Sequence, residues 1–326
     1  MNALSASVAL TMAWIAAAHA GGGCPRQGTL GTSRVLVVDA ATTPRVGLKN
    51  FPRTLSLQDH EVVLTFDDGP WPTTTARVLA ALAHECVRAT FFLIGKPASE
   101  HPELVRRIAA EGHTIGHHTW SHRSLMRIRP GEAAGEIDHG IAAVEMALHG
   151  VATTTPSTPF FRFPGFESTP AALDLLQARG IVVFGADFWA SDWNPMTPKQ
   201  ELKLITDRLK AARKGIILFH DPKVRTAAML PAFLRYLRDN DYHVVHVVSV
   251  EQSADGAPSL RPLHIRRHVT PSDVLWLRRR LHRSLISHLR SSRPRAVSDE
   301  NGAYHDEEPG AQRTRRCLAD GPRGSR

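Results

Sequence analysis

Residues 62–70 read Val-Val-Leu-Thr-Phe-Asp-Asp-Gly-Pro, an apolar run that leads directly into two carboxylates and a turn. The apolar part predicts a buried strand over residues 62–66. Because side chains alternate between the two faces of a strand, Asp67 and Asp68 cannot both follow its pattern. Two interpretations of the pair are open. It is a solvated turn, in which Asp and Gly are common, or a site where a metal ion or a base role offsets the repulsion between adjacent carboxylates.

The pattern of this strand recurs along the chain, and strand-like runs alternate with segments of helical periodicity. Strands are expected at 62–66, 89–94, 113–116, 159–163, 181–184, 215–219 and 243–247, and amphipathic helices at 74–84, 98–111, 132–148, 170–179, 198–213 and 226–239. Such alternation predicts a parallel sheet with helices outside it. Seven repeats without a dinucleotide-binding glycine fingerprint favour a distorted (β/α) barrel of about seven parallel strands over a doubly wound sheet.

The 326 residues divide into four expected parts, of which 61–250 is the catalytic domain. Residues 1–20 resemble a secretory signal peptide, with an apolar run from Leu4 to Ala18 and a small-x-small site that predicts cleavage after Ala20. Lipid anchoring at Cys24 is the less favoured alternative. Residues 21–60 are expected to be loop-like, apart from a strand at 34–38. The protein is therefore expected to be secreted or periplasmic, without a transmembrane segment.

Basic residues are concentrated in the part that follows the barrel. The net charge of +9 comprises +3 from residues 1–250 and +6 from residues 251–326, which hold 15 Arg and no Lys. This extension is expected to be poorly ordered, or to form a basic helix at 272–289 that docks on a polyanion. The charge gives no reason to expect a nucleic-acid partner for the folded domain, and the protein is expected to be a monomer.

Three cysteines are present, and two interpretations of Cys86 are open. In an oxidising compartment Cys24 and Cys86 form a disulfide and leave Cys317 odd. Alternatively, Cys86 is an ordinary buried thiol on an apolar helical segment.

Polar clusters follow five of the expected strands, each where the strand ends. They are Asp67-Asp68, the run from His117 to His122, the run from Arg162 to Gly165, Asp187 with Asp192-Trp193, and His220-Asp221. In a parallel barrel the carboxyl ends of the strands meet on one face, where active sites form. The sequence therefore predicts one site built from all five clusters.

His118 and His122 are four residues apart, a spacing that places both imidazoles on one side of a helical turn. Asp68 supplies a third candidate ligand. Two His and one carboxylate leave a coordination position open for water, as in hydrolytic zinc sites. Non-haem iron oxygenases use the same ligand types. In those sites the carboxylate usually stands in a short His-x-Asp/Glu unit, and neither His118 nor His122 stands in one.

These motifs resemble those of the polysaccharide deacetylase family, also called the NodB-homology group or carbohydrate esterase family 4, over about residues 60–248. The first motif is Thr-Phe-Asp-Asp-Gly at 65–69, and the second, His-(Ser/Thr)-x-x-His, spans 118–122. The third begins with Arg162, the fourth carries Asp192-Trp193, and the fifth is Leu218-Phe219-His220.

The resemblance implies a role for each motif residue. Asp68, His118 and His122 would hold a divalent metal ion, zinc above all, and Asp67 would be the general base, kept ionised by Arg162. The backbone N–H of Gly165 would bind the oxyanion. His220 would protonate the departing amine while Asp192 orients it, and Trp193 and Leu218 would line the acetyl pocket.

Two positions depart from the family pattern. Gly165 stands where Tyr is frequent, and Trp189 stands where an Asp commonly precedes the Asp-Trp pair. Asp187 is a candidate replacement for that Asp, or a surface residue. His117 is a candidate to support the site, or a bystander. Asp221 is a candidate to support the site, or a turn residue. His113 is expected to be structural.

The resemblance implies a secreted deacetylase that removes N-acetyl groups from a glycan containing N-acetylglucosamine, of the chitooligosaccharide or peptidoglycan type. The alternatives are an O-acetyl esterase of the xylan type, an amidase on a small cyclic amide, and a glycan-binding protein without turnover. The last is disfavoured because Asp67, Asp68, His118, His122 and His220 are all present.

Overall fold

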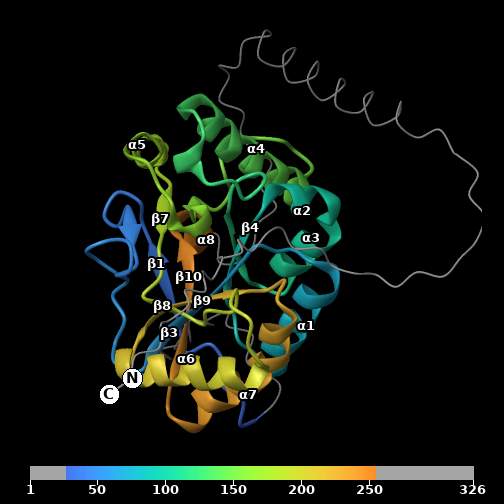
Figure 1. Ribbon diagram of the computed structural model, residues 1–326, viewed down its shortest axis with the longest axis vertical. Coiled ribbons are helices and arrows are strands. Elements are labelled where there is room, and N and C mark those ends of the chain that lie inside the picture. The colour runs from blue at the N-terminus through green and yellow to red at the C-terminus, as the bar shows by residue number, and fades with distance from the viewer. Residues whose placement is uncertain (1–26, 255–326) are drawn as a thin grey trace, which may run out of the picture. The chain divides into compact units, whose positions relative to one another are not determined.

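The computed structural model describes residues 27–254 (Figure 1). The predicted signal peptide, Cys24, Cys317 and the extension from residue 255 onward lie outside the described residues. The strands are β1 (Arg34–Val38), β2 (Arg45–Val46), β3 (Glu61–Asp67), β4 (Thr90–Leu93), β5 (Thr114–His117), β6 (Phe160–Phe161), β7 (Val182–Phe184), β8 (Phe188–Trp189), β9 (Gly215–His220) and β10 (His243–Ser249). The helices are α1 (Pro72–His84), α2 (Gly95–Glu100), α3 (Pro102–Ala110), α4 (Pro130–His149), α5 (Pro170–Ala178), α6 (Pro198–Ala212), α7 (Val224–Asp239) and α8 (Val250–Ala254), with 3₁₀ turns η1 (Leu125–Arg127) and η2 (Pro164–Phe166).

The strands pair in parallel throughout and close into a distorted barrel. The order β3-β4-β5-β6-β7 runs around the ring. The chain then continues from β7 into β8, which pairs with β9, and β9 pairs back onto β3 over residues 62–67. The segment 182–189 thus closes the ring by pairing with β6 at its start and with β9 at its end. The parallel α/β barrel expected from the sequence is confirmed.

Alternation along β3 shows how the sequence fills both sides of the barrel wall. Val62, Leu64 and Phe66 pack outward into the large apolar cluster shared with α1, α3 and α7. Val63 instead joins an inner cluster with Ile216 and aromatic rings from β4, β6 and β7. Further along the same inward face stand Thr65 and Asp67, both buried. The inward face of β3 is therefore apolar before Thr65 and polar from Thr65 to the carboxyl end of the strand.

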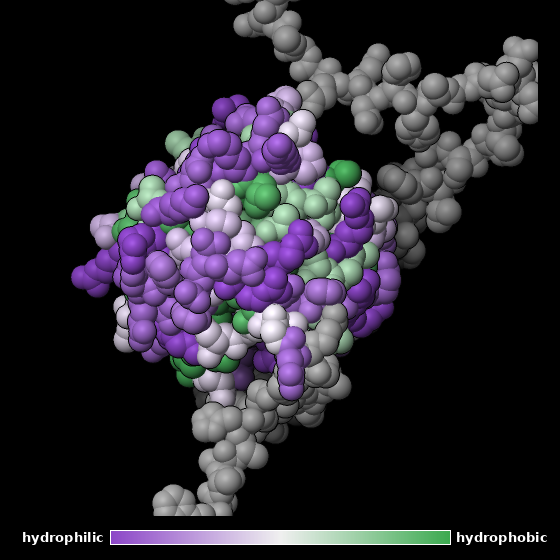
Figure 2. Space-filling view, turned by 90° about the horizontal axis from the view of Figure 1, so that it is seen from below, coloured by the Kyte–Doolittle hydropathy of each residue, from purple (hydrophilic) through white to green (hydrophobic). Residues whose placement is uncertain are grey.

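Five of the outer helices begin with proline as the first residue, a position where its missing N–H removes no helical bond. One such proline corrects the sequence expectation. The single helix expected at 98–111 is two helices, α2 and α3, separated at His101, because Pro102 cannot continue the preceding helix. α6 and part of α7 lie at the lower end of Figure 1, and the view from that side in Figure 2 is mostly hydrophilic.

The segment before residue 61 contains more structure than the sequence suggested. The strand expected at 34–38 is present, and β1 pairs with β10 along its whole length. The second strand, β2, was expected to be loop, but it pairs with β7. Asp187 fixes this segment, because its carboxylate accepts hydrogen bonds from the N–H of Leu48 and the hydroxyl of Thr54, both at 2.8 Å. The segment 27–60 is thus joined to the same sheet as the barrel strands.

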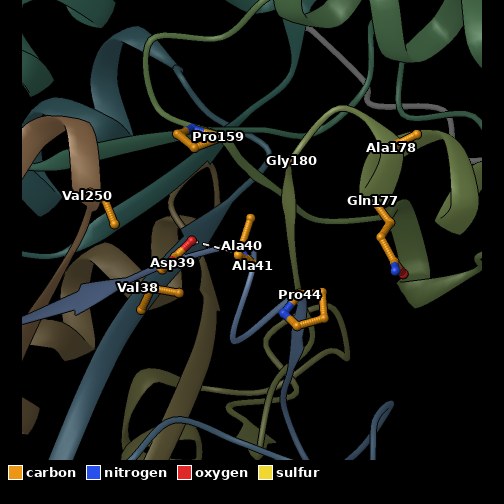
Figure 3. A pocket seen from close by; sticks show the side chains of 10 residues that line it. All are labelled: Val38, Asp39, Ala40, Ala41, Pro44, Pro159, Gln177, Ala178, Gly180 and Val250. Carbon is orange, nitrogen blue, oxygen red and sulfur yellow. Dashed lines mark hydrogen bonds between the residues drawn. The ribbon is translucent and has the colours of Figure 1, made fainter.

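A cavity of about 510 Å³ lies beside the end of β1 (Figure 3). Pro159 and Gly180 line it just before β6 and β7 begin, so it opens at the end of the barrel opposite the carboxyl ends of these strands. Its one carboxylate, Asp39, accepts the N–H of Ala41 at 2.9 Å. This cavity therefore does not contribute to the site formed by the predicted motifs.

Cys86 is disulfide-bonded, so the interpretation as an ordinary buried thiol is wrong. Both other cysteines of the chain lie outside the described residues, and the pairing with Cys24 stays a prediction. Among helices within residues 27–254, none has the length and apolar character needed to cross a bilayer.

Candidate metal and catalytic site

The two adjacent aspartates are separated by a change of backbone conformation at the end of β3. Asp67 is the last residue of the strand and points into the barrel. Asp68 has a φ of 75°, in the left-handed region that non-glycine residues rarely adopt. This conformation turns its carboxylate away from the strand pattern and toward His118 and His122. Uncommon backbone conformations of this kind concentrate at functional sites.

His118 and His122 also converge, although not through the helical turn that their spacing predicted. Residues 118–122 form an irregular loop after β5, in which Thr119 and His122 have φ values of 64° and 59°. The loop brings the two imidazole centroids within 5.0 Å of each other. The two rings therefore lie side by side, but an irregular loop brings them together and the predicted helical turn is wrong.

Three ligand atoms of this site lie within 4.8 Å of one another, one each from Asp68, His118 and His122. Asp68 Oδ1 is 3.4 Å from His118 Nε2 and 3.2 Å from His122 Nε2. This oxygen is buried and has no hydrogen bond of ordinary geometry among the described residues. Burial disfavours the charged form of Asp68, but the two imidazoles outweigh this effect and hold its pKa below the usual range.

The protonation of His118 tests whether these residues fit a cation. Its Nδ1 lies 2.7 Å from the carbonyl oxygen of Arg162. A carbonyl only accepts hydrogen bonds, so Nδ1 carries the proton, and in the neutral ring Nε2 presents a lone pair toward Asp68. The lone pair of His118 Nε2 and the carboxylate oxygen of Asp68, 3.4 Å apart, repel each other unless a cation lies between them. The residues therefore fit a divalent metal ion, and the donor set is typical of zinc.

Arg162 forms the inner wall of the site, with its side chain fully buried in the barrel. Nη1 donates to Asp67 Oδ1 at 2.7 Å and to Thr65 Oγ1 at 2.8 Å. The other nitrogens donate to the carbonyl oxygens of Phe184 and Gly185. The guanidinium carbon lies 4.3 Å from the ring centroid of Phe92, at the upper end of the apolar interior. Burial lowers the pKa of Arg162, and the charge of Asp67 opposes that shift.

His220 and Asp192 form the opposite wall. His220 Nδ1 lies 2.7 Å from Asp192 Oδ1, and the backbone N–H of His220 donates to Asp192 Oδ2 at the same distance. His220 Nε2 faces Asp68 at 4.0 Å. Burial lowers the pKa of His220, but the hydrogen bond and charge of Asp192, with the charges of Asp68 and Asp67, outweigh burial and raise it to about 9. A cation held by Asp68 would offset part of this rise.

The loop after β6 contributes a backbone donor. Gly165 has a φ of 56°, so a side chain there would be strained, although its Cβ would lie in open space with Glu167 as the nearest contact at 3.8 Å. The N–H groups of Phe166 and Glu167 are bonded to the carbonyls of Phe163 and Pro164. The N–H of Gly165 has no hydrogen-bond acceptor within residues 27–254.

Aromatic rings extend from this loop to His220. Phe166 stacks on Trp189 at 5.9 Å, Trp189 contacts Trp193 at 5.8 Å, and the Trp193 ring stands perpendicular to the His220 ring at 5.7 Å. Trp193 is 45% exposed, whereas Leu218 is buried in β9 in register with Trp189. The row provides apolar ring faces next to the His220 wall.

The chain matches the family model described as polysaccharide deacetylase over residues 55–184. A chitooligosaccharide deacetylase from Bradyrhizobium sp. (strain ANU 289) is 33% identical over 161 residues, which are 49% of this chain and 70% of that protein. The chain belongs to the polysaccharide deacetylase family. The predicted family and the predicted enzyme class, a deacetylase, are thereby confirmed.

Two further relatives support the polysaccharide deacetylase assignment. A peptidoglycan-N-acetylglucosamine deacetylase from Bacillus cereus is 31% identical over 217 residues, covering 62% of this chain and 76% of that protein. Among solved structures, a peptidoglycan deacetylase from Bdellovibrio bacteriovorus superimposes with a TM-score of 0.61 at 31% identity. That match covers 70% of this chain, and this chain spans 62% of that protein's length.

Some residues considered from the sequence lie outside this polysaccharide deacetylase site. Asp187 is half-buried, accepts the N–H of Ile216 and holds the segment before β3, and its charge raises the pKa of Arg162 against the effect of burial. His117 faces away, with Nε2 3.8 Å from buried Glu145. His113 is structural, as expected, and accepts the N–H of Ala89. Asp221 is buried, bonds the hydroxyl of Thr75 and therefore supports the turn after β3.

Sequence reasoning missed three side chains that bond a site residue directly or through one intermediate side chain. Thr65 bonds Arg162, and Thr226 and Glu201 lie behind Asp192. Thr65 stands within the first motif, so its inward position two residues before Asp67 was the available signal. Thr226 and Glu201 lie on helices distant in sequence, and no local pattern marked them.

Proposed function

We propose that this protein is a secreted, metal-dependent N-deacetylase of a glycan that contains N-acetylglucosamine. The observation that carries the proposal is the position of the Asp68–His118–His122 cluster between two different pairs. On one side Asp67 is bound to Arg162, and on the other His220 is bound to Asp192. Hydrolysis of an amide requires a base on one side and an acid on the other, and these pairs supply both.

The ligand residues Asp68, His118 and His122 would hold the metal ion, with zinc as the proposed identity. When bound there, a divalent cation lowers the pKa of a coordinated water and polarises a carbonyl oxygen. Asp67 Oδ1 is occupied by Arg162, which leaves Oδ2 as the oxygen that takes a proton from the attacking water. Arg162 fixes the orientation of this carboxylate through the hydrogen bond from Nη1.

The groups on the other side act on the acetyl carbonyl and the leaving amine. The N–H of Gly165, which has no hydrogen-bond acceptor within residues 27–254, is the proposed donor to the oxyanion that develops on the carbonyl oxygen. Burial opposes the protonated form of His220, but the hydrogen bond and the charge of Asp192 favour it, as an acid for the departing nitrogen requires. Asp192 accepts the hydrogen bond from Nδ1 of His220, which orients the ring and stabilises its positive charge.

A sugar substrate is supported by the exposed aromatic surface beside this machinery. Trp193, half exposed and perpendicular to His220, and the ring row that continues to Phe166 offer faces on which a pyranose can stack. The named deacetylase relatives act on chitooligosaccharide and peptidoglycan, which share N-acetylglucosamine units. An O-acetyl esterase of the xylan type remains the second candidate, because an ester needs the same base and a weaker acid.

The test is acetate release by the metal-loaded protein from chitooligosaccharides, peptidoglycan and acetylated xylan. We expect release from the first two and little from xylan. Acetate release from xylan alone would favour the O-acetyl esterase over the N-deacetylase. No acetate release from any of the three substrates would contradict both proposals. Secretion, with cleavage after Ala20, is tested by N-terminal sequencing of exported protein, and a chain that begins at Met1 would contradict it.

A further inference from the structure

Three buried polar side chains form a row behind His220. Asp192, Thr226 and Glu201 all have zero exposure, and they come from the loop after β8, from α7 and from α6. Thr226 Oγ1 lies 2.8 Å from Asp192 Oδ2 and 3.0 Å from Glu201 Oε1. Asp192 in turn contacts His220 through both of its oxygens. The row therefore joins Glu201 to the proposed acid through two intermediate side chains.

The number of hydrogens in this row determines where a proton must be. Two contacts join one oxygen each of Asp192, Thr226 and Glu201, and each contact is attractive only if one hydrogen lies between its two oxygens. The hydroxyl of Thr226 supplies one, so the other belongs to a carboxyl group. Asp192 already accepts the backbone N–H of His220 and faces its Nδ1, which makes Asp192 the acceptor of the row. Glu201 is therefore the carboxyl that carries the proton and donates it to Thr226.

The surroundings of Glu201 agree with this assignment. Burial and the charge of Asp192 raise the pKa of Glu201 to about 7, against the lowering effects of the Thr226 hydrogen bond and the positive charges of Arg225 and His220. The start of α6 also favours a negative charge on Glu201. These opposing effects are insufficient because Oε2 is buried without a hydrogen-bond partner in the described part of the chain. An ionised Glu201 would thus be a buried charge with one unpaired oxygen.

We propose that protonated Glu201 is a positioning residue of the deacetylase, which directs the single hydrogen of Thr226 to Asp192 and so fixes Asp192 against His220. With Glu201 protonated, Thr226 accepts from Glu201 and its own hydrogen is free for Asp192 Oδ2. If Glu201 lost its proton, the two carboxylates would compete for the same hydroxyl hydrogen. This inference rests on the proposed function, because it assumes that His220 acts in catalysis.

Substitutions at Thr226 and Glu201 test the row with rates of acetate release from a chitooligosaccharide. Thr226→Val removes the hydroxyl at nearly constant volume, and we expect kcat to fall about tenfold or more while KM and bound zinc stay unchanged. Thr226→Ser keeps the hydroxyl at position 226, and Glu201→Gln keeps a hydrogen-bond donor at position 201. Each of these variants should retain most of the wild-type kcat at pH 6. The matched control is Thr206→Val, on a buried threonine of α6 that donates only to helix carbonyls. It should leave kcat unchanged.

The pH profile separates positioning from a merely structural role. In the wild type, kcat should decline as pH rises through about 7, and this step should be absent in Glu201→Gln. Identical profiles for the two proteins, or a Thr226→Val enzyme with wild-type kcat, would overturn the inference.

An infrared difference spectrum between pH 5 and pH 9 gives a readout that needs no activity. The protonated carboxyl band of Glu201 should be present in the wild type and missing in Glu201→Gln, while Asp221, the other buried carboxyl with a pKa of about 7, contributes to both. A spectrum unchanged by Glu201→Gln would refute the protonated state of Glu201. Absence of acetate release with the band present would instead refute the proposed function.

Discussion

Arg162 donates a hydrogen bond from Nη1 to Oδ1 of Asp67 at 2.7 Å, and both side chains are almost completely buried. This bond leaves Asp67 Oδ2 on the open side of the carboxylate, 3.8 Å from His118 Nε2. The bond from Arg162 therefore fixes the orientation of the Asp67 carboxylate. The pair lies where the apolar interior of the barrel ends, and either charge would be costly to bury there without the other.

Removal of Arg162 should destabilise the protein as well as inactivate it. Arg162→Met leaves the carboxylate of Asp67 buried without its cation, and we expect the free energy of unfolding to fall by about 3–5 kcal/mol. Urea denaturation of the purified protein measures this loss. In the double variant Arg162→Met/Asp67→Asn the uncompensated charge is gone, so part of the stability should return. Equal losses in the single and double variants would contradict a charge-pair origin.

Loss of His122 should remove the metal ion. Because His122 is one of the three proposed ligand residues, His122→Ala should abolish zinc retention after dialysis and acetate release together. Metal content per chain by elemental analysis, measured beside activity, checks this expectation. The matched control is His84→Ala, on an exposed histidine of α1, which should retain both. A His122→Ala protein with full zinc would show that the ligand set is wrong.

Buried His246 should make stability depend on pH in a defined direction. Burial, with the charge of Arg88, lowers its pKa to about 4, whereas an unfolded histidine titrates near 6.5. Between these values the unfolded chain binds a proton that the native protein does not, so stability falls as pH falls. Relative to His246→Gln, the wild type should lose about 2–3 kcal/mol between about pH 7.5 and about pH 4.5.

Urea unfolding of the wild type and His246→Gln at these two pH values measures the difference. His84→Gln, which removes an exposed histidine, serves as the control and should show no such divergence. A constant difference between wild type and His246→Gln across the range would mean that His246 is not held neutral.

Truncation after residue 254 should leave catalysis intact. The proposed metal, catalytic and pocket residues lie between residues 67 and 220, Thr226 behind them precedes residue 254 as well, and β10 completes the pairing of β1 before residue 250. We expect the truncated protein to release acetate with kcat/KM within about twofold of the full chain, which is less than about 0.4 kcal/mol of transition-state stabilisation. A collapse of kcat, with zinc retained, would show that the extension contributes to the site.

The main strands and helices could be predicted because each carries its own period and its own end signals. β3 has an unbroken apolar run, and α6 begins with a Thr197–Gln200 capping box and with Pro198 as its first residue. β2 and β8 escaped because two-residue strands have no period, and their pairing partners are distant in sequence. The positions of these short strands depend on barrel closure, which no local pattern encodes.

The site residues also divide into those that local sequence marks and those that depend on the folded structure. Asp67, Asp68, His118 and His122 could be proposed from sequence because motif spacing and strand ends mark them. The loop conformation that brings His118 to His122 could not, because it depends on left-handed residues at Thr119 and His122, where no glycine signals them. Glu201 was also invisible, since its contact with Thr226 results from the packing of α6 on α7.

The central claim, that Asp67 is the base beside a metal site formed by other residues, is tested most directly by Asp67→Asn. Asparagine keeps an oxygen for Arg162 but cannot take a proton at neutral pH. Zinc content and acetate release should be measured on the same preparation. We predict one zinc per chain, as in the wild type, with kcat reduced by about 10²–10⁴-fold. Wild-type turnover by the zinc-loaded Asp67→Asn protein would contradict the account.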